Sequence, residues 1–344
     1  MVIVMSDVAT DAHLAVVVQR VQDAGGEAFV SRGVSRTIVG LVGDDELFAT
    51  LNFDALPGVA QVMRVTTPYK LVSRQHHPQM TTVYVGKAKV PIGPDFFTLI
   101  AGPCAVETAE QTLAAAQLAQ AAGATIIRCG AYKPRTSPYA FQGLGEAGLK
   151  ILADVRDQVG LPVITEVVDA SDVELVASYT DMLQVGTRNM QNFPLLQEVG
   201  RAKKPVMLKR GMISSIEEWL MAAEYIAQRG NLDIVLCERG IRTFEDATRN
   251  TLDISAVPVA HSLSHLPVIV DPSHSGGRRD LVLPLTRAAI AVSADGVIID
   301  VHPEPEKALC DGQQALTHQD IEALREVLTK FPPMLGRKLT SVAD

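Results

Sequence analysis

Eight short apolar runs alternate with helical segments through most of the chain, and this alternation restricts the fold more than any other feature. The segments between the runs include AEQTLAAAQLAQAAG and SIEEWLMAAEYIAQRG, whose apolar residues recur at helical spacing. Eight strand–helix units in about 240 residues predict a TIM (β/α)8 barrel, an α/β fold with a closed parallel sheet. An open doubly wound sheet is the alternative, but GPCAVE lacks the glycine-rich turn that usually follows its first strand. The eight runs are FTLIAG, TIIRCG, VITEV, MLQVG, VMLK, DIVLC, VIVD and GVIID.

The segment before the barrel has a different pattern. MVIVM, EAFVSRG, RTIVGLVG and VAQVMRV are strand-like, whereas ATDAHLAVVVQRVQDAGG and DDELFATLNFDAL are helical, which gives the order βαββαβ. This order predicts a small ferredoxin-like domain. SRQHHPQM is polar without periodicity, and VYVGKAKVPIG is typical of a hairpin. We therefore expect a ferredoxin-like regulatory domain over residues 1–72, a linker and hairpin over 73–95, and a catalytic (β/α)8 barrel over 96–335.

Composition and charge exclude several classes of protein. The 344 residues are 47% hydrophobic and 20% charged, which supplies a large core and excludes wholesale disorder. The net charge of −8 argues against a general role on nucleic acids or membrane surfaces. The start, MVIVMSDVATD, is not a secretion signal, and no run of 18 apolar residues predicts a membrane span. The four scattered cysteines are expected to be reduced thiols, so we expect a cytoplasmic enzyme.

Functional side chains in a TIM barrel lie at the C-terminal ends of the strands. Nearly every predicted strand here ends in a side chain able to bind a metal or an anion, whereas random strand ends would mostly be small or apolar. In strand order these residues are Cys104; Arg128, Lys133, Arg135 and Thr136; Glu166; Arg188; Lys209; Arg239; His274; and Asp300 with Asp311 in its loop.

These strand-end residues form two chemical sets. The first offers a thiolate, an imidazole and two carboxylates, which suit Mn²⁺, Fe²⁺, Co²⁺ or Zn²⁺: Cys104, His274, Asp300 and Asp311. The second holds six cations that suit phosphate and carboxylate groups: Arg128, Lys133, Arg135, Arg188, Lys209 and Arg239. A metal beside a site for several anions predicts phosphorylated substrates with a carbonyl group to polarise.

Each of these residues also has a simpler interpretation when taken alone. Cys104 could be a structural cysteine, His274 a capping residue and Asp311 a turn residue; only their shared face favours a site. Glu166 stands between the two interpretations, as a residue that positions water or a cation or as a structural one. The residues without such support are interpreted as structural: Cys129, Cys237, Cys310, His76, His77 and His302.

At these positions the sequence resembles the type I β class of 3-deoxy-7-phosphoheptulonate (DAHP) synthases. The resemblance covers about residues 95–330 and rests on IAGPCAVE, RCGAYKPRTSPYAFQGLGE, QVGTRNMQN, MLKRG, LCERG, DPSHSGG and DVHPEPEKALCDGQQ. It implies a metal-dependent transferase that condenses phosphoenolpyruvate with erythrose 4-phosphate at the first step of the shikimate pathway. The N-terminal domain resembles the regulatory extension of some members, which implies feedback by tyrosine or phenylalanine and a homo-oligomer, either a dimer or a tetramer.

The resemblance also implies a role for each site residue. Cys104, His274 and Asp311 match metal ligands, whereas Asp300 stands where the family usually has glutamate, so direct ligation by Asp300 is left open. Arg135 and Thr136 match the residues that receive erythrose 4-phosphate. Lys133 is the candidate proton donor to the aldehyde oxygen, with a metal-bound water as the alternative. Phosphoenolpyruvate is matched to Arg128, Lys133, Arg188, Lys209 and Arg239.

Three other functions were weighed against this one. The nearest is 3-deoxy-manno-octulosonate 8-phosphate synthase, which uses arabinose 5-phosphate; KPRTS and the N-terminal extension favour the heptulosonate enzyme. A Schiff-base aldolase acting through Lys209 is the second, and the Cys/His/Asp set argues against it. The third is a non-catalytic barrel that senses an amino acid, and only the unusual Asp300 supports it.

Overall fold

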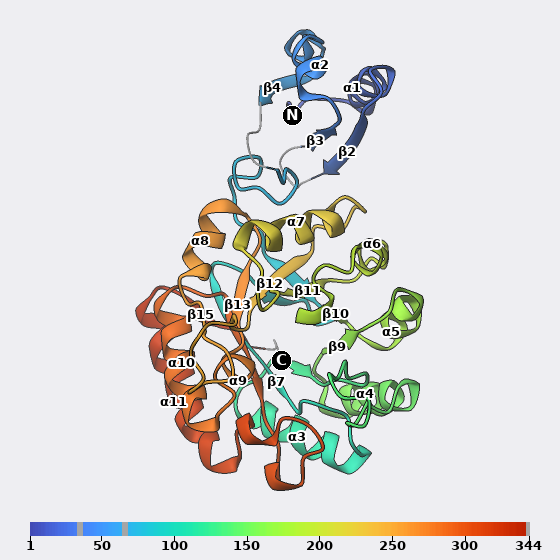
Figure 1. Ribbon diagram of the computed structural model, residues 1–344. Coiled ribbons are helices and arrows are strands. Elements are labelled where there is room, and N and C mark those ends of the chain that lie inside the picture. The colour runs from blue at the N-terminus through green and yellow to red at the C-terminus, as the bar shows by residue number, and fades with distance from the viewer. Residues whose placement is uncertain (33–36, 64–67, 342–344) are drawn as a thin grey trace.

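The computed structural model describes residues 1–32, 37–63 and 68–341, except the side chains of residues 45 and 46. A small N-terminal domain lies beside a closed barrel, outside helices α7 and α8 (Figure 1). In the part of the chain that the structure describes, every helix is too short or too polar to span a bilayer.

The N-terminal domain is a four-stranded antiparallel sheet with its helices on one side. The strands lie in the order β2-β3-β1-β4, the arrangement of a ferredoxin-like fold, which confirms the prediction. The first helix begins at Thr10, whose hydroxyl accepts a hydrogen bond from the backbone N–H of His13. The elements are β1 (Val2–Met5), α1 (Asp11–Asp23), β2 (Glu27–Arg32), β3 (Thr37–Val42), α2 (Asp45–Ala49) and β4 (Val59–Met63).

The second helix of this domain is shorter than the sequence predicts. In place of one helix over DDELFATLNFDAL, α2 ends at Ala49 and a 3₁₀ turn covers Phe53–Ala55. Between them Asn52 has a left-handed backbone with φ of 47°. Residues five apart on an α-helix lie about 140° apart around its axis, so a continuous helix would bury only one of Phe48 and Phe53. The break allows both rings to enter the core.

The barrel contains the eight parallel strands predicted from the sequence. Each strand pairs with the next along the chain, and β14 pairs with β7 to close the sheet. A short strand, β15 (Lys338–Leu339), pairs with the start of β7. The barrel strands are β7 (Phe96–Gly102), β8 (Ile126–Arg128), β9 (Val163–Val167), β10 (Met182–Val185), β11 (Val206–Lys209), β12 (Ile234–Glu238), β13 (Val268–Val270) and β14 (Gly296–Asp300).

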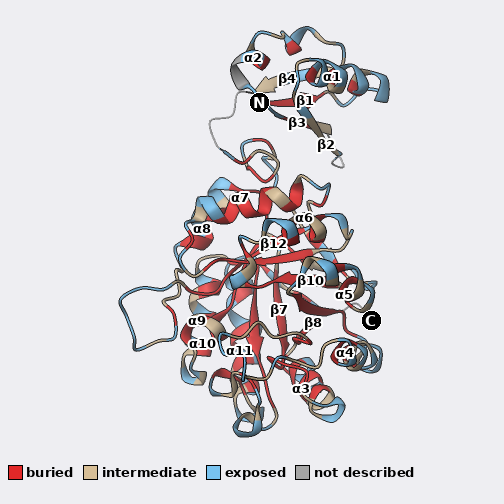
Figure 2. Cartoon of the chain, turned by 45° about the vertical axis from the view of Figure 1, so that its right-hand side comes forward, coloured by how far each residue is buried: buried red, intermediate tan, exposed pale blue. Residues whose placement is uncertain are grey.

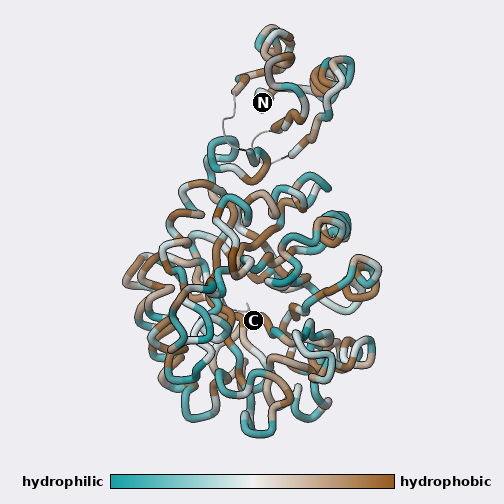
Figure 3. The backbone as a smooth tube through the Cα atoms, in the orientation of Figure 1, coloured by the Kyte–Doolittle hydropathy of each residue, from teal (hydrophilic) through white to brown (hydrophobic). Residues whose placement is uncertain are grey.

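Helices surround the strands and shield them from solvent. The strands are buried throughout, whereas the outer helix faces are exposed (Figure 2) and carry the hydrophilic residues (Figure 3). The helices are α3 (Ala109–Ala121), α4 (Glu146–Val159), α5 (Val173–Tyr179), α6 (Phe193–Arg201), α7 (Ile216–Ala227), α8 (Ala256–Leu263), α9 (Pro272–Gly276), α10 (Arg279–Ala291) and α11 (His318–Met334).

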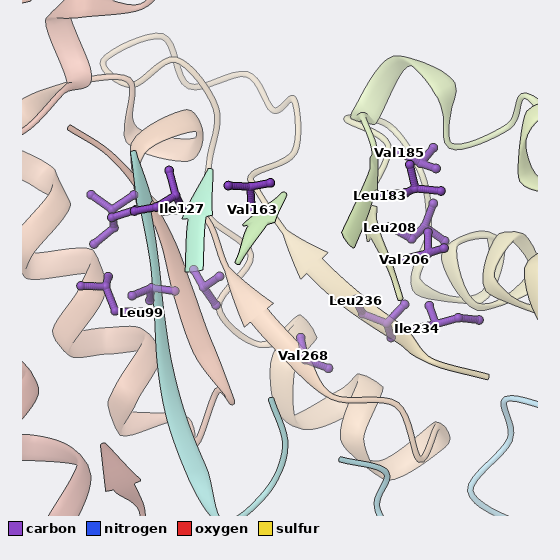
Figure 4. Close-up of a cluster of buried hydrophobic side chains, with 14 of the residues drawn as sticks. Leu99, Ile127, Val163, Leu183, Val185, Val206, Leu208, Ile234, Leu236 and Val268 are labelled. Carbon is purple, nitrogen blue, oxygen red and sulfur yellow. The ribbon is translucent and has the colours of Figure 1, made fainter. Parts of the chain in front are cut away.

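The strands bury apolar side chains on both of their faces. One layer packs between the strands and the helices and includes Leu99, Ile127, Val163 and Leu236 (Figure 4). Successive side chains alternate across a strand, so the residues next in sequence to this outer layer point inward. They form a second layer inside the barrel. The residues of this inner layer include Ile100, Ile126, Ile164, Met182, Met207, Val235, Ile269 and Ile298.

A hairpin closes the barrel at the end where the strands begin. Its strands, β5 (Val83–Val85) and β6 (Val90–Ile92), pair antiparallel as the sequence predicts. The side chains of Val83, Val85, Val90 and Ile92 pack against the inner layer of the barrel. Thr98 near the start of β7 also donates a hydrogen bond to the carbonyl of Pro91, with a distance of 2.7 Å. The open end is therefore the one that carries the strand-end side chains.

We expect the Ile92→Ala substitution to destabilise the barrel by about 2–5 kcal/mol, because it leaves a cavity in a fully buried layer. The matched control is Tyr84→Ala on the exposed face of the same hairpin, which should change stability by about 0.5 kcal/mol or less. Urea unfolding followed by the fluorescence of Trp219, the single tryptophan, measures both. Equal losses of unfolding free energy in the two variants would contradict the conclusion that the hairpin closes this end of the barrel.

Candidate active site

The C-terminal strand ends surround a cavity of about 410 Å³ that most of the predicted site residues line. Cys104 and Asp300 are buried next to it. The backbones at the ends of β7 and β8 approach each other closely below this cavity. Only glycine fits at position 102, because a Cβ there would lie 2.0 Å from the carbonyl oxygen of Arg128. The predicted residues on its wall are Arg128, Lys133, Arg135, Thr136, Glu166, Arg188, Lys209, Arg239, His274 and Asp311.

The four predicted metal ligands lie together at one side of this cavity. Cys104 Sγ lies 3.3 Å from Asp311 Oδ2 and 4.0 Å from His274 Nε2. His274 Nε2 lies 3.6 Å from Asp311 Oδ2 and 3.7 Å from Asp300 Oδ2. Strands β7, β13 and β14, which are neighbours in the sheet, supply three of the four, and the loop after β14 supplies Asp311.

This set of donor atoms fits a divalent transition metal. Ligand atoms bound at about 2.0–2.3 Å to one tetrahedral ion are about 3.3–3.8 Å apart, which is close to the separations here. A thiolate and an imidazole with carboxylate oxygen suit Zn²⁺, Fe²⁺, Co²⁺ or Mn²⁺ better than Ca²⁺ or Mg²⁺. The hydrogen bond to Cys310 and burial raise the pKa of the Cys104 thiol, so a cation must stabilise the thiolate.

Asp271, which the sequence interpretation did not single out, orients the histidine of this cluster. Its carboxylate accepts hydrogen bonds from the backbone N–H of His274 at 2.8 Å and from Nδ1 at 3.1 Å, which directs Nε2 towards the cluster. Its other oxygen accepts a hydrogen bond from Lys209 Nζ at 2.5 Å. Burial alone would raise the pKa of Asp271, but His274 and Lys209 hold it well below its usual range. The signal available in the sequence was its place in DPSH, directly after a strand.

Cys310, which the sequence interpretation treats as structural, lies beside the candidate metal ligands. Its sulfur lies 3.4 Å from Cys104 Sγ and accepts a hydrogen bond from Arg135 Nη1 at 2.6 Å. The hydrogen bond from Cys104 lowers the pKa of Cys310 to about 7, against the effect of burial. With Cys104 and Asp311 it forms a second group of closely spaced potential ligands. Position 310 follows no strand directly, so only the folding of its loop brings this thiol to the site.

Asp300 has both carboxylate oxygens engaged by protein groups. Oδ1 forms a buried ion pair with Arg128, and Oδ2 accepts a hydrogen bond from Gln314 Nε2 at 2.6 Å. Both partners are almost fully buried. Arg128 Nε is also buried, and among the described residues no group accepts a hydrogen bond from it. A buried guanidinium with an unused donor at a cavity wall is suited to binding an anion.

The cations of the KPRTS segment contact the two cysteines at the candidate metal site. Lys133 Nζ donates hydrogen bonds to the backbone carbonyl of Cys104 at 2.9 Å and to its sulfur at 3.0 Å. Thr136 accepts a hydrogen bond from Arg188 at 3.3 Å, which links the loops after β8 and β10. Burial lowers the pKa of Arg239 on the far wall, so a bound anion would be favourable there.

Glu166 is buried at the end of β9, at the cavity wall. Gln184 on β10 donates a long hydrogen bond of 3.4 Å to its carboxylate. A Cβ on Gly186 would lie 1.9 Å from Glu166 Oε1, so only glycine leaves room for this carboxylate. The glutamate is thus held at the cavity wall, where it can accept a hydrogen bond from water or face a cation.

Two further arginines line the cavity, although the sequence analysis did not predict them as site residues. Arg242 and Arg249 belong to the loop between β12 and α8, several residues beyond the strand end, where strand-end reasoning does not reach. Arg249 Nη1 donates to Asp311 Oδ1 and to Gln314 Oε1, each at 3.1 Å. The residues that the sequence left outside the site, and that do not line the cavity, are Cys129, Cys237, Cys310, His76, His77 and His302.

Comparisons with known proteins identify the family of both domains. Residues 74–335 match the family model of the DAHP synthetase I family, and residues 1–67 match that of the DAHP synthase ferredoxin-like domain. The chain is 51% identical over 339 residues to a phospho-2-dehydro-3-deoxyheptonate aldolase of Thermotoga maritima, covering 98% of this chain and 100% of the relative. It is 36% identical over 250 residues to a 2-dehydro-3-deoxyphosphooctonate aldolase of Magnetococcus marinus, covering 67% of this chain and 86% of that relative.

Two solved structures from Thermotoga maritima share the fold. The crystal structure of its phospho-2-dehydro-3-deoxyheptonate aldolase superposes with a TM-score of 0.78 at 50% identity, covering 98% of both chains. A truncated form of the 3-deoxy-D-arabino-heptulosonate 7-phosphate synthase superposes with a TM-score of 0.73 at 52% identity, covering 79% of this chain and 99% of that one.

Proposed function

Because the chain belongs to the DAHP synthetase I family, we propose that its barrel rim condenses phosphoenolpyruvate with erythrose 4-phosphate. The products are 3-deoxy-D-arabino-heptulosonate 7-phosphate and phosphate, so the chain is a transferase that forms a carbon–carbon bond. The observation that carries the assignment to the rim is the contact between a metal-ligand cluster and a cavity rich in cations. The octulosonate alternative is disfavoured, because those relatives match at lower identity and over a smaller part of the chain.

Phosphoenolpyruvate carries a phosphate and a carboxylate, and the cavity offers cations for both. We assign Arg128, Lys133, Arg188, Lys209 and Arg239 to this substrate. The unused Nε donor of Arg128 supports the assignment, because a carboxylate or phosphate oxygen would satisfy it. Lys209 is already neutralised by Asp271, so it can remain close to Arg239 before the substrate arrives.

Erythrose 4-phosphate is assigned to the KPRTS side of the cavity. Arg135 and Thr136 would hold its phosphate, which leaves the aldehyde directed towards Cys104 and His274. The contact between Thr136 and Arg188 supports adjacent sites for the two substrates. Holding the reacting carbons in this arrangement lowers the entropic part of the barrier.

Cys104, His274 and Asp311, with Asp300 as a possible fourth ligand, would hold the divalent metal. A bound ion of this kind supplies Lewis-acid polarisation of the aldehyde. The identity of the ion is left among Mn²⁺, Fe²⁺, Co²⁺ and Zn²⁺. Asp271 fixes the ring of His274, and Lys133 stabilises the thiolate of Cys104 through its 3.0 Å contact.

Side chains of the protein would then stabilise the charges that develop at each step of the reaction. As C3 of phosphoenolpyruvate bonds to the aldehyde carbon, Lys133 is placed to give a proton to the new alkoxide oxygen. Glu166 would orient the water that adds at C2 and accept the proton that this water releases. The phosphate leaves from the resulting hemiketal while Arg188, Lys209 and Arg239 neutralise its growing negative charge.

Metal removal should abolish activity. We expect chelator-treated protein to lose turnover and to regain it when a divalent metal is added. Cys104→Ser should weaken metal binding by more than the about 10–100-fold that loss of an outer-shell partner costs. Cys129→Ala is the matched control, since Cys129 is buried nearby but belongs to neither group of potential ligands. Full turnover in protein shown to be free of metal would refute this part of the proposal.

Lys133 and Arg135 should affect different kinetic constants. We expect Lys133→Met to lower kcat by about 10²–10⁴-fold, the usual contribution of a positioned proton donor. Arg135→Ala should mainly raise KM for erythrose 4-phosphate, because it holds a phosphate remote from the reacting carbons. Steady-state kinetics with each substrate varied in turn measures both effects. Equal losses confined to kcat would show that the two residues do not divide the work in this way.

We also propose that residues 1–72 mediate feedback inhibition by tyrosine or phenylalanine in a homo-oligomer. Every assigned site residue lies beyond Gly102, and the end of this segment is anchored to α7, where Glu224 accepts hydrogen bonds from the backbone N–H groups of Leu71 and Val72 at 2.9 and 3.0 Å. Inhibition requires that the effector bind the less active arrangement more tightly. The solved truncated relative supports independent folding of the barrel.

Removal of residues 1–70 should therefore leave turnover largely intact and remove the inhibition. Initial rates with and without each amino acid, measured on the full and shortened chains, check this expectation. Persistent inhibition of the shortened chain would place the effector site on the barrel. Loss of turnover in a folded, shortened chain would assign the domain a structural role instead.

A further inference from the structure

Arg249 contacts the metal-ligand cluster from outside the set of strand ends. Its guanidinium Nη1 donates to Asp311 Oδ1 and to Gln314 Oε1, both at 3.1 Å. The side chain is 40% exposed, whereas Asp311 is 19% exposed. One cation on the loop between β12 and α8 thus bridges two residues of the loop after β14.

The two carboxylate oxygens of Asp311 have different partners. Oδ1 faces Arg249, while Oδ2 faces Cys104 Sγ at 3.3 Å and His274 Nε2 at 3.6 Å. A carboxylate held at one oxygen cannot rotate freely, so Oδ2 stays directed towards the cluster. The backbone of Asp311 is also held in a left-handed conformation, with φ of 53°.

The contact with Gln314 acts on the other carboxylate of the cluster. Because Gln314 Oε1 accepts from Arg249, its amide nitrogen must point the opposite way, where it donates to Asp300 Oδ2 at 2.6 Å. Without Arg249, the buried amide could turn over and place its oxygen against the carboxylate. Aspartate is one methylene shorter than glutamate, so the position of the Asp300 carboxylate depends strongly on such neighbours.

The position of Arg249 is itself fixed by the helix that carries His274. The backbone N–H of Arg249 donates to the carbonyl of Gly276 at 3.2 Å, and Asn250 donates through its side chain to the carbonyl of His274 at 3.2 Å. Gly277 makes room for the arginine stem, since a Cβ there would lie 2.4 Å from Arg249 Cβ. The loop is therefore built against α9 and does not merely lie over the cavity.

We infer that Arg249, acting through Asp311 and through Gln314 to Asp300, is a positioning residue for the metal. It sets the direction of both carboxylates from the side opposite to Asp271, which sets the direction of His274. The inference rests on the proposed metal ligands. It differs from a role in substrate binding, which the place of Arg249 on the cavity wall would also allow.

Arg242 provides a matched control for the charge of Arg249. It belongs to the same loop and lines the same cavity, and the structure gives its side chain no contact with Asp300, Asp311 or Gln314. Arg242→Met and Arg249→Met each remove one positive charge and keep an unbranched side chain. Only the second removes the two hydrogen bonds at the cluster.

The test is titration of the metal-free full chain with Mn²⁺ alone, with no substrate present. Arg249→Met should weaken Mn²⁺ binding by about 10–100-fold, as loss of other outer-shell partners does. Arg242→Met should bind as the parent does. Gln314→Leu should weaken binding as well, and the double variant Arg249→Met/Gln314→Leu should lose less than the product of the two single effects, because they break one chain of contacts.

Parent-like Mn²⁺ affinity in Arg249→Met, with a raised KM for a substrate, would overturn the inference and make Arg249 a substrate residue. A parent chain that binds no Mn²⁺, Fe²⁺, Co²⁺ or Zn²⁺ would overturn the proposed metal site and this inference with it. Trp219 fluorescence checks that each variant is folded. Should Arg249→Met fail to fold, Gln314→Leu tests the same link from its buried side, and parent-like affinity there also overturns the inference.

Discussion

The pairing of β14 with β7 closes the barrel and, at the same seam, brings the candidate metal ligands together. Its register sets Asp300 opposite Gly102, two residues before Cys104. Strand β13 pairs with β14 on the other side and leads into the short helix that carries His274. Three neighbouring strands therefore bring a carboxylate, a thiol and an imidazole together, although they are up to about 200 residues apart in sequence. A slip of one residue in this register would turn Asp300 away from the cluster.

Most of the cations lie at the ends of the remaining strands. Carboxylates that pair with them offset the free-energy cost of burying several positive charges close together. Arg128 pairs with Asp300 and Lys209 with Asp271 in buried ion pairs, whereas the pair of Arg249 with Asp311 is partly exposed. Buried ion pairs add little net stability, but losing one partner is expensive, so each pair fixes the direction of both side chains. The carboxylates of Asp271 and Asp300 therefore contact both the candidate metal ligands and the cations that would hold the anionic substrates. The position of each set of residues thus depends on the other.

The fold was accessible from sequence because its periodic signals are strong. All eight barrel strands, the hairpin and the ferredoxin-like order follow from apolar spacing, whereas the break at Asn52 depended on where Phe48 and Phe53 must pack. The positions of residues such as His274 follow from the barrel topology, which places strand-end residues on one rim. The positions of Cys310 and Arg249 do not, because their loops fold back over the rim by contacts that no local pattern encodes.

On the proposed function, one divalent metal binds at Cys104 on the seam of the barrel. X-ray absorption at the zinc edge, on full chain loaded with one Zn²⁺, tests this binding site directly. One sulfur neighbour is expected at about 2.3 Å, among nitrogen and oxygen neighbours at about 2.0–2.2 Å. That sulfur should disappear in Cys104→Ser and persist in Cys310→Ser. A shell without sulfur in the parent chain, or a sulfur that survives Cys104→Ser, would contradict it.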